Sequence, residues 1–143
     1  MVTSLSNISE FIKLAGLAQI ALAIGSLAIP RILRWKSELS KVRPLIKQMF
    51  WTYAAYIFAI NLSFGLISAY CYRELTNGSR LAILINGFIA VYWISRVGIQ
   101  FMYFDRSDFP VGKWNKLGEI VLVGLFIALS VVYSMSFYFN YKQ

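Results

Sequence analysis

The chain has 143 residues, of which 59% are hydrophobic and only 14% are charged, and its net charge is +8. Soluble domains are about 45–50% apolar and about 25% charged, so this composition argues against a water-soluble domain and favours a membrane protein. The chain has no histidine and a single cysteine, Cys71, which excludes histidine-ligated haem, Ser-His or Cys-His catalysis and an internal disulfide.

The first apolar run, residues 11–29, is followed by Pro30, which is expected to end the helix. No basic residue precedes the run, and it is longer than the apolar part of a signal peptide, so we expect a retained membrane span. Small residues, which allow helices to approach closely in lipid, share one of its faces. This face consists of Ala18, Ala21, Gly25 and Ala28. Packing within the protein is the preferred interpretation of this face, and a contact between identical chains is the alternative.

Residues 31–48 form a basic segment that contains six lysines and arginines and a single acid, Glu38. Apolar Ile32 and Trp35 lie among the basic residues, which predicts a short amphipathic helix on the membrane surface, in contact with anionic lipid headgroups. Pro44 is expected to begin the next span, because proline is tolerated in a first helical turn. Basic residues beside apolar runs follow the positive-inside rule, so no nucleic-acid partner is predicted despite the net charge.

The second predicted span covers residues 49–72 and has an amide, Asn61, near its centre. Gly65, Ser68 and Tyr72 follow it at helical spacing and share its face. An amide inside the bilayer needs a hydrogen-bond partner, so this face is expected to point into the helix bundle.

The third predicted span, residues 81–104, carries the most informative polar pattern of the chain. Five residues recur at steps of seven, three, four and three, and so lie on one helical face, which we call the Arg96 stripe. The stripe consists of Asn86, Trp93, Arg96, Gln100 and Tyr103. Arg96 lies about 12 Å inside the cytoplasmic end of the helix, and an arginine at the bilayer centre costs about 2.5–3.5 kcal/mol. We therefore expect either an ion-pair partner for Arg96 or an anion or lipid headgroup bound along the stripe.

The fourth predicted span covers residues 117–139 and begins close to the acidic residues of the preceding loop. The candidate ion-pair partners of Arg96 are Asp105, Asp108 and Glu119. Such carboxylates would also suit Mg²⁺ held together with a phosphate. A hydrated loop with a helix-capping aspartate is the preferred interpretation, and neither a metal nor a cofactor is predicted.

The predicted architecture is an all-α integral membrane bundle of four transmembrane helices, up-down-up-down, in a single domain over residues 1–143. Residues 31–48 and 105–116 together carry nine lysines and arginines, against four on the opposite side of the bundle. By the positive-inside rule we expect a multi-pass protein of the cell membrane, with both termini outside and both basic loops in the cytoplasm.

Catalytic residue types are scarce, and four short spans enclose little volume, so the preferred function is non-catalytic. The chain is predicted to be a subunit or homo-oligomeric scaffold of a membrane complex, associated with itself or with other membrane subunits. One alternative is an oligomeric channel or small carrier for an anionic substrate or lipid headgroup, lined by the Arg96 stripe. Another is a lipid-modifying enzyme with a cytoplasmic-face site. The stripe and Asn61 are the candidate binding residues, and no catalytic residue is assigned.

Overall fold

The computed structural model describes residues 2–103 and 112–142, and every regular element within them is helical. The four long helices are α1 (Val2–Gly25), α4 (Pro44–Tyr70), α5 (Arg80–Met102) and α6 (Lys113–Lys142). The short segments between them are η1 (Ser26–Ala28), α2 (Ile29–Ile32), α3 (Trp35–Glu38), η2 (Leu39–Lys41) and η3 (Glu74–Thr76). Four stretches are long and apolar enough to cross a membrane: Asn7–Ile32, Pro44–Tyr70, Arg80–Met102 and Lys113–Lys142. The predicted all-α fold with four candidate spans is thus confirmed for the described residues.

The prolines show how the chain begins its helices. Pro30 was expected to end the first span, but it lies inside α2. The 3₁₀ segment η1 interrupts the α-helical ladder before it, so Pro30 falls in the first turn of a new helix, where its missing N–H costs no hydrogen bond. Pro44 occupies the first turn of α4, as predicted. At the start of α5, the Ser79 side chain accepts a hydrogen bond of 3.1 Å from Ala82 N and caps the helix.

Helices α1 and α4 touch backbone to backbone at two glycines, Gly16 and Gly65. A Cβ atom added to Gly16 would lie 2.8 Å from the Gly65 carbonyl oxygen, and one added to Gly65 would lie 2.9 Å from Ile20 N. Side-chain atoms do not approach a backbone this closely, so the crossing requires glycine on both helices. The contact also shows that α1 and α4 run antiparallel, because Gly16 lies against Ala69 whereas Ile20, further along α1, lies against the earlier residue Gly65.

The predicted small-residue face of α1 does not make this contact. Ala21, Gly25 and Ala28 are exposed, and a Cβ atom added to Gly25 would meet nothing within 4 Å. The preferred interpretation, that this face packs within the protein, is therefore wrong for these three residues. Small residues occur all round α1, so their presence alone did not identify the inner face. The inner face carries Ile12, Ala15, Gly16, Gln19 and Ala23.

The core lies between the two antiparallel helix pairs, α1 with α4 and α5 with α6. Aromatic rings form its centre: Trp93 of α5 stacks on Phe126 of α6 with the ring centroids 5.3 Å apart. The Tyr92 ring of α5 packs edge-on against the Phe64 ring of α4, with the centroids 5.2 Å apart. This contact joins the two helix pairs. Offset and edge-on ring contacts of this kind are favourable beyond the area they bury.

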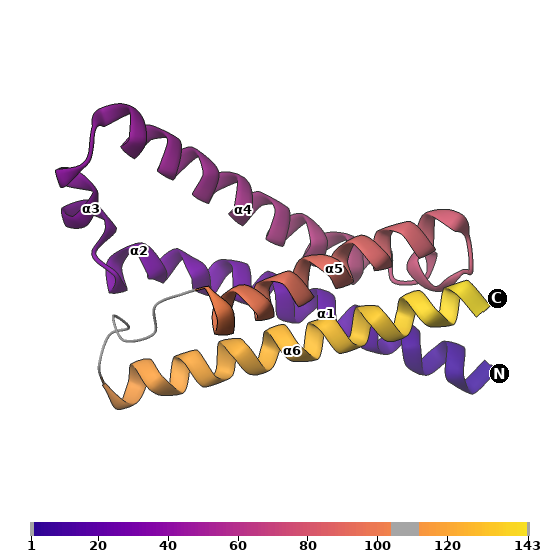
Figure 1. Cartoon of the computed structure of the whole chain (residues 1–143). Helices are drawn as coiled ribbons and strands as arrows, with labels where there is room; N and C mark the ends of the chain where they lie inside the picture. The colour runs from indigo at the N-terminus through magenta and orange to yellow at the C-terminus, as the bar shows by residue number, and fades with distance from the viewer. Residues whose placement is uncertain (1, 104–111, 143) are drawn as a thin grey trace.

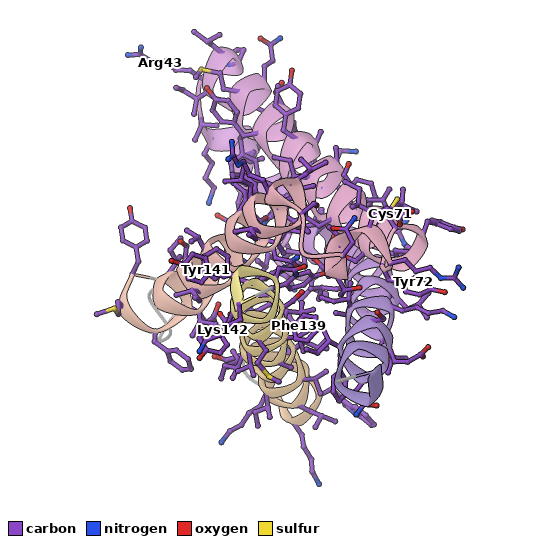
Figure 2. All side chains as sticks on the ribbon, turned by 90° about the vertical axis from the view of Figure 1, so that its right-hand side faces the viewer. Arg43, Cys71, Tyr72, Phe139, Tyr141 and Lys142 are labelled. Carbon is purple, nitrogen blue, oxygen red and sulfur yellow. The ribbon has the colours of Figure 1, made fainter. Side chains whose placement is uncertain are left out.

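Only the second half of α4 belongs to this core. The buried residues of α4 are Phe64, Gly65 and Ser68, and none of residues 44–60, which we call the outer half of α4, is buried. Figures 1 and 2 both show the outer half diverging from the other long helices, and Figure 2 places Arg43 at its far tip. The N- and C-termini lie together at the opposite end of the molecule (Figure 1).

Candidate functional site

Each of the four long helices contributes one side chain to a buried polar network at the centre of the molecule. Gln19 of α1 accepts a hydrogen bond of 3.0 Å from the Trp93 indole N–H of α5, and its amide donates to the Tyr133 hydroxyl of α6. The Tyr133 hydroxyl also shares a hydrogen bond with Ser68 of α4. All four side chains are at most 1% exposed. In an apolar interior, such bonds satisfy groups that would otherwise be costly to bury, so the network holds all four helices in one arrangement.

A second network fixes the connection between α4 and α5 at the end of the molecule that carries the termini. The side-chain amides of Asn86 and Asn140 both donate to the Leu75 carbonyl oxygen, at 2.8 Å each. Asn140 Oδ1 in turn accepts a hydrogen bond of 2.8 Å from Gly78 N. The connection is thus bound to both α5 and α6, although it is a short turn. Figure 2, viewed from this end, labels Cys71 and Tyr72 at the beginning of the connection and Phe139 on α6.

Asn86 has one buried polar atom, Oδ1, that makes no hydrogen bond to the described residues. Its amide N–H groups, in contrast, donate to Leu75 O and Ala82 O. Rotating the amide would face its oxygen toward two carbonyl oxygens, so the assigned orientation is the favourable one.

Arg96 is half-buried and lies over the ring of Phe126, with its guanidinium carbon 5.2 Å from the ring centroid. This cation–π contact offsets part of the cost of taking the Arg96 charge out of water. One turn further along α5, Gln100 donates to a Glu119 carboxylate oxygen at 3.5 Å. The predicted ion pair of Arg96 with Glu119 stays a prediction, and its other candidate partners, Asp105 and Asp108, lie outside the described residues. Within the described residues, no group of three or more acidic or cysteine side chains is placed to hold a metal ion.

The Arg96 stripe is distributed over three places rather than gathered in one pocket. Asn86 binds the connection at one end, Trp93 belongs to the central network, and Gln100 contacts Glu119 toward the other end. The helical rise separates Asn86 from Gln100 by about 21 Å, which is too far for one small ligand. Tyr103 is 82% exposed and follows the last residue of α5.

Asn61 lies on the face of α4 that the sequence predicted to point inward. Gly65 and Ser68 on that face are buried, and Asn61 itself is half-buried. Its side-chain oxygen accepts a hydrogen bond of 2.6 Å from the Tyr92 hydroxyl of α5. The predicted hydrogen-bond partner of this amide is therefore a tyrosine of the neighbouring helix.

Sequence reasoning did not single out Gln19, Tyr133 or Asn140, which carry the two networks. Gln19 was recognisable as the amide within the first apolar run, where a polar group needs a partner. Tyr133 and Asn140 belong to a polar stripe on α6 at steps of three, three and four. That stripe consists of Ser130, Tyr133, Ser136 and Asn140, all buried. Its spacing was as regular as that of the Arg96 stripe, but it carries no charge.

The basic segment forms a shallow groove at the end of the molecule opposite the termini. The groove has a volume of about 450 Å³. It is lined by Pro30, Arg31, Arg34, Lys36, Ser37 and Trp51. The lining thus brings together three cations, Arg31 of α2, Arg34 between α2 and α3, and Lys36 of α3, and it contains no carboxylate.

Comparisons with known proteins add no family to these observations. No protein-family model, no curated protein and no solved structure matches this chain.

Proposed function

We propose that the chain is a non-catalytic, homo-oligomeric scaffold protein of a membrane. The observation that carries this proposal is the outer half of α4, which has no buried residue although it belongs to the candidate membrane span Pro44–Tyr70. Its large side chains are exposed, among them Tyr53 at 56%, Tyr56 at 64% and Ile57 at 51%. The polar side chains of the interior bond one another across the four helices, which supports a structural use for them rather than a path or a reaction site.

A second copy of this chain is the partner that the outer half of α4 fits. The exposed face of Ala21, Gly25 and Ala28 on α1 offers a shallow surface into which large side chains can pack. Because α1 and α4 are antiparallel and touch at Gly16 and Gly65, this face lies at the same depth as the outer half of α4. A rotation axis normal to the membrane relates two copies without changing the depth of any residue. The outer half of α4 in one copy therefore meets the Ala21, Gly25 and Ala28 face of another copy, and the contacts close into a symmetric oligomer.

We propose that the four spans cross the membrane up-down-up-down, with the termini outside and the basic groove in the cytoplasm. The support is the excess of lysine and arginine in residues 31–48 and 105–116. In a Cys71→Ser background, Glu38→Cys is expected to react with a membrane-impermeant maleimide only after the cytoplasmic face is opened. Asn77→Cys is expected to react in intact cells. Both side chains are exposed, so the reverse pattern would contradict this orientation.

Cross-linking between two chains tests the oligomer. Two differently tagged forms are expressed together in the Cys71→Ser background, one with Gly25→Cys and the other with Ile57→Cys. Mild oxidation is expected to give a disulfide-linked heterodimer as the main product, because the two positions share one depth on the proposed contact.

The matched control replaces Ile57→Cys with Val121→Cys. Val121 is 53% exposed and lies in the part of α6 at the same end of the molecule, but outside the proposed contact. Equal cross-linking for the two pairings would show random collision in the membrane. If no heterodimer formed with Ile57→Cys, this would contradict a contact between the outer half of α4 and a second copy of the chain.

A further inference from the structure

The groove at the start of α4 has the composition of a site for an anion. Arg31, Arg34 and Lys36 all line it, and no acidic side chain does. Three like charges held around one groove repel each other, and an anion placed between them removes that repulsion. Guanidinium groups bind phosphate oxygens through paired N–H donors, and two of the three cations that line the groove are arginines.

The backbone that carries these side chains is held in a defined conformation. Arg34 has φ 53° and ψ 47°, the left-handed conformation that non-glycine residues adopt at a cost of about 1–2 kcal/mol. Its carbonyl oxygen accepts hydrogen bonds from Glu38 N at 3.0 Å and from the Ser37 hydroxyl at 3.1 Å. The left-handed turn separates α2 from α3 and sets the Arg31 and Lys36 side chains around the same groove.

An aromatic cluster fastens this turn to α4. The Trp35 ring packs edge-on against Phe50, with centroids 4.8 Å apart, and against Trp51 at 5.7 Å. Trp51 is also part of the groove wall. The cations are therefore presented by a segment that is bound to the membrane helix, rather than by a free loop.

The position of the groove favours a phospholipid headgroup over free phosphate as the bound anion. It lies where the first apolar stretch ends and the second begins, which is the level of the membrane interface. Tryptophan is a residue that favours this level, and Trp51 lies in the wall of the groove. We propose that this groove binds the phosphate of an anionic phospholipid, whose chains extend from the groove into the bilayer. This proposal does not depend on the oligomer proposed above.

The test measures lipid retention by the purified full chain. The protein in detergent is equilibrated with phosphatidylglycerol, or with phosphatidylcholine as the zwitterionic reference, and bound lipid is counted by native mass spectrometry. The triple variant Arg31→Gln, Arg34→Gln, Lys36→Gln is expected to lower the affinity for phosphatidylglycerol at least about tenfold, because charge-assisted hydrogen bonds are lost. Binding of phosphatidylcholine is expected to stay weak in all variants.

The matched control is Lys41→Gln, Arg43→Gln, Lys47→Gln. It removes the same charge from the same segment but from residues outside the groove lining. It is expected to change the affinity less than about twofold, because these cations make no contact in the groove. If the two triple variants lost equal affinity for phosphatidylglycerol, the lipid would bind a diffuse basic surface and not the groove, which would overturn the proposal.

A competition arm separates the two sources of phosphate. Inorganic phosphate at millimolar concentration is expected to leave phosphatidylglycerol bound, because it lacks the acyl chains. Displacement of the lipid at that concentration would assign the groove to free phosphate and overturn the lipid proposal. The single variant Arg34→Gln, outside the hydrophobic core, keeps the test interpretable if the triple variant is poorly produced, and it is expected to show part of the same loss.

Discussion

Replacing Gly16 by alanine is expected to destabilise the protein by about 2–3 kcal/mol, although alanine is the better helix former. The added Cβ atom would lie 2.8 Å from the Gly65 carbonyl oxygen and against the backbone of Ser68 and Ala69. These are backbone atoms, so the clash is relieved only if α1 and α4 move apart. Their separation would also loosen the contacts that Gln19 makes three residues further along α1. The free energy of unfolding, measured by SDS titration in mixed micelles, gives the effect directly.

The matched control is Gly124→Ala in α6. A Cβ atom at Gly124 would meet nothing within 4 Å, so the substitution tests helix propensity without a clash. Its expected effect is between zero and about 1 kcal/mol of stabilisation. If Gly16→Ala and Gly124→Ala shifted the unfolding free energy equally, α1 and α4 would not be in contact at Gly16.

Replacing Gln19 by leucine is expected to destabilise the protein by about 2 kcal/mol. The substitution keeps a side chain of similar size but leaves the Trp93 indole N–H without its acceptor and removes one partner of the Tyr133 hydroxyl. Interhelical hydrogen bonds in membranes are worth about 0.6 kcal/mol on average and up to about 1.7, and an unpaired buried donor adds to that loss. The same SDS titration measures it, and near-UV circular dichroism reports the environment of Trp93.

A double-mutant cycle with Tyr133→Phe isolates the bond between the two side chains. The two substitutions are expected to be non-additive by about 1 kcal/mol, because each removes the same hydrogen bond. Ser63→Ala is the control, since the Ser63 hydroxyl is exposed and bonds only to Ala59 O of its own helix. Strictly additive effects of Gln19→Leu and Tyr133→Phe would contradict a direct bond between them.

The sequence allowed the four apolar helices to be predicted, because length and apolar composition determine which segments can span a bilayer. It also allowed the inward face of α4 at Asn61, Gly65 and Ser68 to be predicted, because a polar group inside a span has to find a partner. Arg96 and Trp93 were correctly placed on one face of α5. What each contacts depends on the neighbouring helix, and helical spacing within one segment does not reveal that neighbour.

Other features were not predictable for a physical reason specific to membranes. Lipid chains are as apolar as a protein interior, so the exposed and buried sides of a span differ little in hydrophobicity. The divergence of the outer half of α4 therefore leaves no pattern in residues 44–60. For the same reason the small residues of α1 gave no indication that Gly16, rather than Gly25, meets α4. Pro30 was misassigned because the 3₁₀ segment before it changes the hydrogen-bond register.

The two ends of the bundle differ in their mechanical freedom. At one end, Asn86 and Asn140 bind the connection between α4 and α5, so the helices there are joined by hydrogen bonds as well as by packing. At Gly16 and Gly65 the backbones of α1 and α4 touch, and the outer half of α4 diverges from α1. A helix adapts to bilayer thickness by changing its tilt, at a modest cost for each ångström of mismatch. For the membrane arrangement proposed above, we expect this adaptation in the outer half of α4, where no residue is buried, rather than at the hydrogen-bonded end.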